Sequence, residues 1–296
     1  MEKRQDHFNL LQKAYYKLAR PMLTERAFSQ MSMNRWLGGG QLDDPRTFNE
    51  KIQWLKLFYR DPLFPKLADK WAVREIVEKR VGSSILNELY QVCDDPRDID
   101  WDGLPNSFVL KATHGSGMNV FVRDKSTIDT SAVTQQLQKW LKTDYSRFGH
   151  EWVYRDASRR IIAEAYLVDE NGAVPKDYKV FCFNGLPRYI QVDVDRFGKH
   201  TRAFYDVEWN QQPFTILHPM ASGSVSSPQH LREMLMAAET LAKGLPFVRI
   251  DFYALPRIVF GEMTFFPEGG VANFEPPAWD VQLGQMITLP PTRHHS

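Results

Sequence analysis

The chain has 296 residues, of which 43% are hydrophobic, and its 37 basic and 36 acidic residues give a formal net charge of +1. This length is sufficient for one large domain or for two to three smaller lobes with a sizeable core. Because the charge is nearly balanced and no basic block or tail occurs, we expect no nucleic-acid partner.

The N-terminal region, residues 1–104, is predicted to be mainly helical. Residues 8–20 place aromatic and aliphatic side chains at helical spacing among basic ones, which predicts a helix that packs on its own domain or associates peripherally with a membrane. The polar first residues are no signal peptide, and no apolar run is long enough to be a transmembrane segment. Cys93 and Cys182 lie in no metal or redox spacing, so we expect a soluble, cytoplasmic protein.

Two further helices are expected before the first strand. Thr47-Phe48-Asn49-Glu50 has the pattern of a capping box, and Ile52, Leu55 and Phe58 follow at helical spacing. Residues 66–79 predict a second helix. No internal repeat and no low-complexity tract is present.

A glycine-containing loop, His114-Gly115-Ser116-Gly117, lies between the strand-like runs 107–111 and 119–122. Its glycines permit backbone conformations that present N–H groups to phosphate, although such a loop can also be an ordinary turn. It matches neither the P-loop nor the dinucleotide pattern. Lys111, at the end of an apolar strand, is well placed to neutralise phosphate; the alternative is a lysine that extends from the sheet edge into solvent.

Helices are expected over residues 130–142 and 228–243, with a loop over residues 222–227. Residues 160–167 predict a strand that leaves a polar segment, which we expect to be a hinge between lobes. Glu164 and the backbone of Tyr166 and Leu167 could receive an adenine ring, or could form a plain strand end.

A hairpin is predicted around Asn184-Gly185, a strong turn signal between the runs 177–183 and 187–193. Asp177 and Lys179 share one face of the first run. They could hold a ribose hydroxyl and a phosphate, or form a simple ion pair on the surface. Because strands and helices do not alternate regularly, an α+β fold is favoured over a doubly wound sheet.

A second hairpin carries charges inside two apolar runs, residues 247–253 and 258–265. Symmetric pairing about the link 254–257 would place Arg249 opposite Glu262 and Asp251 diagonal to it. Charge in an apolar strand requires a partner or a cation. Two carboxylates, an arginine and the hydroxyl of Thr264 on one face suit Mg²⁺ and phosphate, but a structural ion pair is an equally good interpretation of the hairpin alone.

The order of these groups along the chain resembles the ATP-grasp superfamily and, within it, the TupA-like branch linked to teichuronopeptide and surface-polysaccharide synthesis. The resemblance runs from about Thr47 to Pro290, and its most specific strings are residues 48–56, 67–74, 111–119, 177–185 and 247–267. It implies two α+β lobes that clasp ATP: a small lobe over 105–163 with the glycine loop, and a large lobe over 164–290 with the metal site. Residues 1–104 would be the helical region before them, and residues 291–296 a tail.

The resemblance also implies roles for individual residues. ATP would be bound by Lys70, Lys111, His114, Gly115, Ser116, Gly117, Glu164, Tyr166, Leu167 and Asp177. Mg²⁺ would be bound by Asp251, Glu262 and Thr264, with Glu262 bridging two ions, and Arg249 and Lys179 would be catalytic. The family usually has Asn at the position of Thr264, and a hydroxyl is a poorer Mg²⁺ ligand, which puts a second metal ion in question.

The implied activity is an ATP- and Mg²⁺-dependent ligase that joins a small-molecule or glycan carboxylate to an amine through an acyl phosphate. Asp195, Arg196, Arg202 and Glu268 are candidates for the substrate side. The alternatives are a sugar kinase, a glycosyltransferase-like enzyme and a non-catalytic nucleotide-binding partner of polysaccharide assembly. The joint presence of Arg249, Asp251 and Glu262 disfavours the last, because ATP binding alone needs fewer groups.

Overall fold

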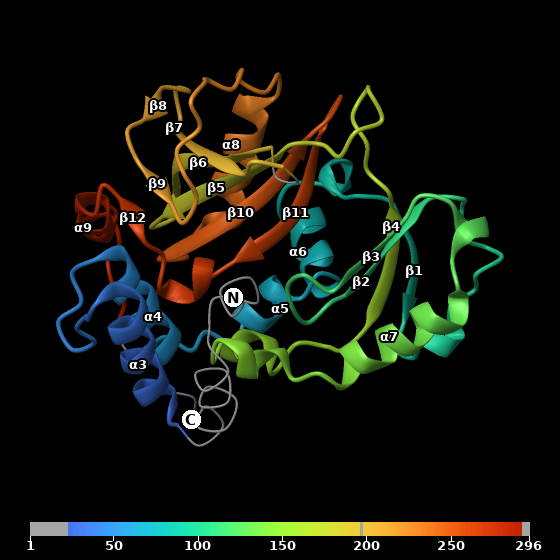
Figure 1. Ribbon diagram of the computed structural model, residues 1–296, viewed down its shortest axis with the longest axis horizontal. Coiled ribbons are helices and arrows are strands. Elements are labelled where there is room, and N and C mark those ends of the chain that lie inside the picture. Colours follow the sequence, from blue (N-terminus) through green and yellow to red (C-terminus); the bar gives the residue numbers. More distant parts are fainter. Residues whose placement is uncertain (1–22, 196–197, 292–296) are drawn as a thin grey trace.

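The computed structural model describes residues 23–195 and 198–291. Helices α5 and α6 lie between its two larger antiparallel sheets, of four and six strands (Figure 1). The mixed helices and antiparallel sheets agree with the predicted α+β class. The predicted helix over residues 8–20 and the substrate candidate Arg196 lie outside the described residues. Within the described ranges, no helix has the length and apolar character needed to cross a membrane.

The N-terminal helices are α3 (Glu25–Leu37), α4 (Phe48–Phe58), α5 (Phe64–Ala68) and α6 (Ala72–Arg80). The predicted capping box is confirmed, since the side chains of Thr47 and Glu50 each accept from the other residue's backbone N–H at the start of α4. The single helix predicted over 66–79 is wrong. Asp69 ends α5, and its Oδ1 accepts from the backbone nitrogens of Trp71 and Ala72, both at 2.8 Å, so that a new helix begins there.

The small sheet has the strand order β1-β4-β2-β3, formed by β1 (Leu89–Cys93), β4 (Ile161–Ala165), β2 (Phe108–Ala112) and β3 (Asn119–Val122). One face packs on α7 (Thr130–Lys142), whose Leu137 is fully buried with Phe108 and Leu110. The small lobe was expected to span residues 105–163. Because β1 pairs with β4, the small sheet instead begins at Leu89, and it ends at Ala165. β1 is half exposed and its burial does not alternate, so no sequence pattern marks it.

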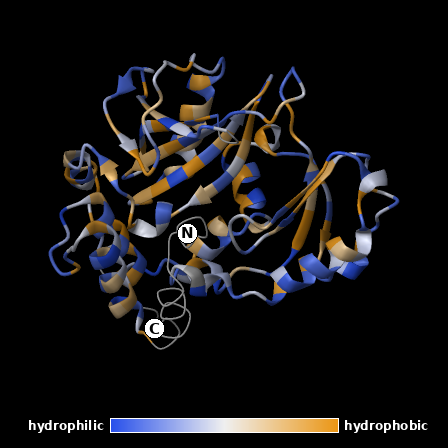
Figure 2. Ribbon diagram, viewed as in Figure 1, coloured by the Kyte–Doolittle hydropathy of each residue, from blue (hydrophilic) through white to orange (hydrophobic). Residues whose placement is uncertain are grey.

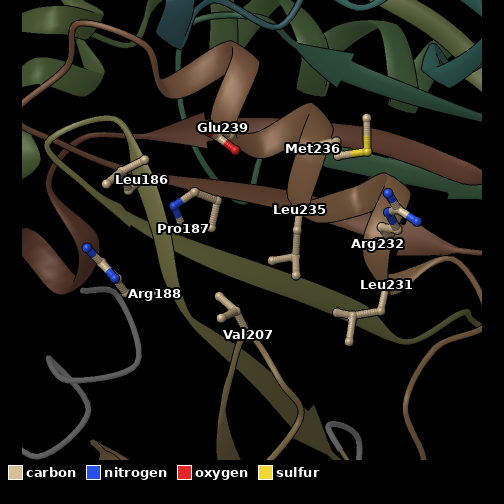
Figure 3. A pocket seen from close by; sticks show the side chains of 9 residues that line it. All are labelled: Leu186, Pro187, Arg188, Val207, Leu231, Arg232, Leu235, Met236 and Glu239. Carbon is tan, nitrogen blue, oxygen red and sulfur yellow. The ribbon is translucent and has the colours of Figure 1, made fainter.

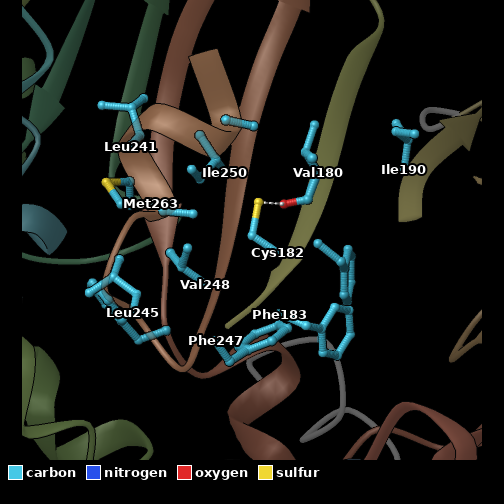
Figure 4. Packing of buried hydrophobic residues seen from close by; sticks show 14 of the residues in the cluster. Val180, Cys182, Phe183, Ile190, Leu241, Leu245, Phe247, Val248, Ile250 and Met263 are labelled. Atoms are coloured by element: carbon cyan, nitrogen blue, oxygen red, sulfur yellow. Dashed lines mark hydrogen bonds between the residues drawn. The ribbon is translucent and has the colours of Figure 1, made fainter. Parts of the chain in front are cut away.

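The large sheet has the strand order β11-β10-β5-β6-β7-β8. Its strands are β11 (Ile258–Thr264), β10 (Phe247–Ala254), β5 (Asp177–Phe183), β6 (Leu186–Val194), β7 (Thr201–Asp206) and β8 (Gln211–Gln212). One face is apolar and packs on α8 (Leu231–Ala242), as Figure 4 shows for Val180, Ile250 and Leu241. The predicted β5–β6 hairpin is confirmed, with Asn184 and Gly185 both at positive φ.

The register of the β10–β11 hairpin differs from the prediction. Asp251 lies opposite Glu262, and Arg249 lies opposite Thr264, so the expected pairing of Arg249 with Glu262 is wrong. The turn is one residue shorter than expected, because Ala254 already pairs with Ile258. Gly261 adds a β-bulge, in which a Cβ would come within 2.9 Å of the carbonyl oxygen of Asp251. The two shifts together move the carboxylates into direct opposition.

Helix α9 (Ala278–Gln285) packs against the start of α4, near the two-stranded sheet of β9 (Thr215–Ile216) and β12 (Phe274–Glu275). The Cα of Gly284 faces backbone at this contact. A Cβ there would lie 2.2 Å from the carbonyl oxygen of Arg46 and 2.7 Å from the nitrogen of Phe48. Only glycine allows this approach of the two helices.

We therefore predict that Gly284→Ala lowers the free energy of unfolding by about 1–3 kcal/mol, as expected for overpacking. Alanine favours a helix by about 1 kcal/mol over glycine, so helix propensity alone predicts the opposite sign. Urea unfolding of the variant measures the difference. Gly223→Ala is the control, because a Cβ at Gly223 meets nothing within 4 Å. A Gly284→Ala protein as stable as the wild type would contradict the predicted contact.

Candidate active site

Three charged side chains form a row across three strands, on the face of the large sheet opposite the one that packs on α8. Lys179 on β5 lies opposite Asp251 on β10, and Asp251 lies opposite Glu262 on β11. In Figure 2, blue segments interrupt the otherwise mostly orange β10 at the centre of this sheet. The sequence pattern anticipated that Asp251 and Glu262 would lie diagonally on one face of the hairpin, not directly opposite each other, and it did not anticipate that Lys179 lies opposite Asp251.

Arg249 holds Asp251 through two hydrogen bonds, donated by Nε to Oδ1 and by Nη2 to Oδ2, both at 2.7 Å. Its Nη2 also donates to Thr264 Oγ1 at 3.2 Å and lies 3.8 Å from Glu262 Oε1. Burial works to lower the pKa of Arg249, but the charge and hydrogen bonds of Asp251 outweigh it and raise that pKa. The guanidinium is therefore a permanent positive charge in the row.

Lys179 and Lys70 supply two more cations. Lys179 Nζ pairs with Asp177 and lies 3.4 Å from Asp251 Oδ2. Lys70 Nζ lies 3.1 Å from Glu262 Oε2. Burial works to raise the pKa of Glu262, but Lys70 and Arg249 lower it to about 2, so the carboxylate is ionised at neutral pH.

Lys70 connects the large sheet to the glycine loop. It lies in the break between α5 and α6, where its backbone nitrogen donates to Thr113 O at 3.2 Å. Its Nζ donates to Gly115 O at 2.7 Å, from the same position at which it reaches Glu262. The helix break that the sequence pattern missed is thus what places this lysine between the two lobes.

The small sheet contributes a second ionic group. Lys111 Nζ lies 2.7 Å from Glu164 Oε2, and Arg74 Nη1 lies 2.8 Å from Glu164 Oε1. Lys111 and Glu164 occupy the same face of the sheet, because Lys111 pairs with Ile162 and Val109 pairs with Glu164. Arg74 was not anticipated; on α6 it looks like one more surface charge, and only the fold brings it to Glu164.

Tyr166 and Leu167 follow the end of β4, where the chain leaves the small sheet. The hydroxyl of Tyr166 accepts from Arg123 Nε at 3.1 Å, and its ring packs edge-on against Phe121. Phe121 is 61% exposed. This aromatic pair forms an open surface beside Glu164, which is where a planar base could be received.

The glycine loop has a buried base and an exposed tip. The His114 ring is fully buried, its Nε2 lies 3.0 Å from Trp140 O, and burial lowers its pKa. The His114 side chain is thus enclosed, and only the backbone of this residue could contact a ligand. Gly115 packs on the Tyr145 ring, where a Cβ would lie 2.6 Å from the ring, whereas Ser116 and Gly117 are exposed. Gly117 has φ 78, a conformation that glycine adopts without strain.

The loop after β11, residues 267–270, is held by polar side chains of α4. Gln53 Nε2 donates to Gly269 O at 2.8 Å and to Gly270 O at 3.0 Å. Lys56 Nζ donates to Gly269 O at 3.3 Å although the side chain is only 1% exposed. Asn49 exchanges hydrogen bonds with the backbone of Ala272 at 2.7 and 2.8 Å. These three residues recur at i, i+4 and i+7, a polar stripe on a buried helix face that could have indicated this role.

We predict that Gln53→Leu lowers turnover about tenfold or more while nucleotide affinity changes little. The substitution keeps the approximate volume but removes both bonds to the 269–270 backbone, so that the loop loses its position. Steady-state kinetics and nucleotide titration test this. Gln30→Leu on α3 is the control, because the side chain of Gln30 donates to Asn34 and to the backbone of Gly40, not to this loop. Equal losses of turnover and nucleotide affinity would contradict the assignment.

Asp251 and Glu262 fit one Mg²⁺, because two carboxylates from adjacent strands can supply part of its octahedron and phosphate oxygens and water the rest. Arg249 donates to Thr264 Oγ1 and to both oxygens of Asp251, so a metal ion on Asp251 would require Arg249 to release one of these oxygens. Among residues 23–195 and 198–291, no group of three or more His, Cys, Asp or Glu side chains is gathered for a metal ion. A metal at this hairpin would therefore depend on the phosphates of a bound nucleotide.

A separate groove of about 400 Å³ lies between α8 and the β6–β7 region, as Figure 3 shows. Its lining includes Leu186, Leu235 and Met236, with Arg188 and Arg232 among them. None of the charged groups described above lines it.

Several solved structures and one family model match the chain. No curated protein matches the chain. Among solved structures, the ADP complex of N5-carboxyaminoimidazole ribonucleotide synthetase is 13% identical with a TM-score of 0.42, over 67% of this chain and 45% of that one. D-alanine–D-alanine ligase from Bacillus anthracis is 16% identical with a TM-score of 0.42, and the match covers 87% of this chain and 72% of that one. The ATP-grasp ligase PsnB with Mg and ADP is 12% identical with a TM-score of 0.42, and the match covers 86% of this chain and 65% of that one.

The chain thus spans between about half and three quarters of the lengths of these proteins. A family model described as TupA-like ATPgrasp matches residues 50–288, which is most of the chain and includes all the charged groups described above. The chain belongs to the TupA-like ATP-grasp family.

Proposed function

We propose that the chain is an ATP- and Mg²⁺-dependent ligase that joins a carboxylate to an amine through an acyl phosphate. The observation that carries the proposal is the row of Lys179, Asp251 and Glu262 beside Arg249, linked to the glycine loop by Lys70. Both the carboxylate nucleophile and the γ-phosphate are anionic, so their approach needs a site in which cations surround the reacting oxygens.

In the first step, an oxygen of the substrate carboxylate attacks the γ-phosphorus, the bond to the β–γ bridging oxygen breaks, and ADP leaves with the electron pair. Lys70 and Lys111 would bind the phosphates under the glycine loop, with N–H donors from residues 115–117. Arg249 and Lys179 would stabilise the charge on the transferred phosphoryl group. Mg²⁺ on Asp251 and Glu262 would supply further charge neutralisation when bound.

In the second step, an amine attacks the acyl carbon, and phosphate leaves.

Glu164 and the backbone of Tyr166 and Leu167 would receive the adenine, and Asp177 the ribose. For Glu164 to accept the amino group, Lys111 or Arg74 would have to release one of its oxygens. We therefore infer that nucleotide binding exchanges internal ion pairs for contacts with ATP.

We further propose that the acid is a uronic acid or an amino acid of a cell-surface glycan, and that the reaction takes place in the cytoplasm, where ATP is available. The family resemblance supports this choice of acid.

We also propose the division of the chain into a small lobe up to residue 163 and a large lobe from residue 164, with β1 added to the small lobe.

Hydroxylamine trapping tests the reaction. The protein is incubated with ATP, Mg²⁺, hydroxylamine and a panel of uronic and amino acids, and hydroxamate, ADP and phosphate are measured. Equal amounts of hydroxamate, ADP and phosphate would support the ligase. ADP without free phosphate, together with a phosphorylated sugar, would replace it by the kinase. Nucleotide binding without any ADP would favour the non-catalytic partner.

A further inference from the structure

A second polar cluster lies on the same sheet face, on β6 and β7. Gln191 pairs with Lys179, so the residue two positions on, Asp193, faces the same side as the row at Lys179. Gln191 Nε2 donates to Asp193 Oδ1 at 3.2 Å. Asp193 in turn lies opposite Arg202 on β7. The cluster is therefore continuous with the proposed site of phosphoryl transfer.

Arg202 is fully engaged inside the protein. Its Nε donates to Asp193 Oδ1 at 2.6 Å and its Nη1 to Ile216 O at 2.9 Å, and both charged side chains are 5% exposed. Burial works to raise the pKa of Asp193, but Arg202 and Lys179 outweigh it and hold that pKa well below its usual range. Arg202 and Asp193 thus form a buried ion pair, in which the charge of Asp193 balances that of Arg202.

Two stacked histidines lie on this pair. His200 Nε2 is 3.2 Å from Asp193 Oδ1, and the His200 and His218 ring centroids are 3.8 Å apart with an interplanar angle of 28°. His218 is partly exposed. Burial lowers the pKa of His218, and the charges of Arg202 and His200 act in the same direction, while Asp193 and Glu268 oppose them. At neutral pH His218 is therefore an uncharged base.

Glu268 completes the cluster from the loop held by Gln53 and Lys56. Its carboxylate Oε1 lies 3.7 Å from Arg202 Nη1, and its charge also contributes to raising the pKa of Arg249. Glu268 is therefore close to both the cluster and the reacting groups. The carboxylate of Glu268 therefore supplies negative charge beside His218 and the ion pair of Asp193 and Arg202.

We propose that His218, His200 and Glu268, supported by Asp193 and Arg202, form the acceptor subsite, and that the acceptor is a primary amine that arrives as its ammonium ion. Glu268 pairs with the ammonium, and His218 takes one proton from it. The free amine then attacks the acyl carbon, so that the C–N bond forms and the C–O bond to phosphate breaks. The second amine proton leaves with phosphate, and His218 returns its proton to solvent. This inference rests on the proposed ligase function.

Two probe nucleophiles separate this subsite from the rest of the reaction. At neutral pH hydroxylamine is mostly uncharged, whereas methylamine is almost entirely methylammonium and has to lose a proton before it can attack. The rates of hydroxamate and N-methylamide formation are measured with the same acid, and their ratio is compared among variants. We expect His218→Asn to lower the ratio of amide to hydroxamate about 100-fold, within the range for loss of a general base.

The ratio should recover in His218→Asn as the pH rises and methylamine loses its proton in solution. Glu268→Gln should raise the KM for methylammonium about tenfold more than the KM for hydroxylamine. His230→Asn is the matched control, because His230 lies at the start of α8, where it contacts Glu233, and it should keep the wild-type ratio.

The outcomes distinguish the two proposals. If the wild type forms no hydroxamate with any acid, the ligase function fails. If the wild type forms hydroxamate but His218→Asn keeps the wild-type ratio, or loses both products in equal proportion, the acceptor subsite is overturned while the ligase stands. A wild type that forms hydroxamate and no methylamide would also overturn the ammonium subsite.

Discussion

Glu262→Gln is expected to lower turnover by about two to three orders of magnitude, because an ion that neutralises the reacting phosphates contributes several kcal/mol and each 1.36 kcal/mol is tenfold in rate. Glutamine has nearly the same shape, but it removes the charge that pairs with Lys70 and that would bind Mg²⁺ opposite Asp251. Formation of ADP over a Mg²⁺ titration measures both the loss of rate and the higher Mg²⁺ concentration that the variant needs.

Glu170→Gln is the matched control, since Glu170 is exposed in the loop before β5. Wild-type turnover in the Glu262→Gln protein, with an unchanged Mg²⁺ requirement, would remove the metal site from this hairpin. A variant that no longer folds would be recognised by its circular dichroism, and the comparison would then move to Glu262→Asp.

The pH dependence of stability provides a second measurement on the same variant. The pKa of Glu262 is lowered from 4.5 to about 2 in the folded protein. A carboxylate with a lowered pKa stabilises the fold fully above its unfolded-state pKa, and this contribution is lost as the pH falls towards the folded-state pKa. The free energy of unfolding of the wild type should therefore be higher than that of Glu262→Gln. This difference should be largest above about pH 4.5 and should shrink as the pH falls towards about 2.

Features set by neighbouring residues could be predicted from the sequence. The capping box at Thr47, the turn at Asn184-Gly185 and the helix Thr130–Lys142 all depend on local hydrogen bonds and local backbone preferences. The charged residues of the β10–β11 hairpin were also anticipated, because charge inside an apolar strand is conspicuous.

Features set by distant contacts could not be predicted. The break at Asp69 depends partly on the bond between Lys70 N and Thr113 O, and the pairing of Arg74 with Glu164 joins residues 90 positions apart. The bulge at Gly261 shifts the register of the hairpin from Asp251 and Glu262 onwards, although a strand glycine alone does not say whether a bulge is present. In each case the deciding partner lies in another element.

Thr264 shows how a register error changes an interpretation. At the sequence level this residue is a weakened metal ligand in place of an amide. In the structure it lies opposite Arg249 and accepts a hydrogen bond from it at 3.2 Å. We infer that its hydroxyl positions the arginine, and that the metal depends on Asp251 and Glu262.

Glu164→Gln is expected to destabilise the protein by about 3 kcal/mol, at the lower end of the cost of breaking a buried ion pair. The variant leaves Lys111 and Arg74 without their carboxylate, and these side chains are only 21% and 16% exposed. The free energy of unfolding from urea titration measures the loss. Glu88→Gln is the control, because Glu88 is exposed just before the neighbouring strand β1, where its carboxylate accepts a hydrogen bond from the hydroxyl of Tyr90.

The same variant tests the adenine subsite when the titration is repeated with ATP. A ligand stabilises the fold by RT ln(1 + [L]/Kd), so a tenfold weaker affinity at saturating ATP reduces the stabilisation by about 1.4 kcal/mol. GTP presents a carbonyl where ATP presents an amino group, so the variant should also lose part of any preference for ATP. Destabilisation with an unchanged response to ATP and GTP would make Glu164 a structural anchor for Lys111 and Arg74 alone. A reduced ATP response with unchanged stability would instead show that the ion pairs contribute little to the fold.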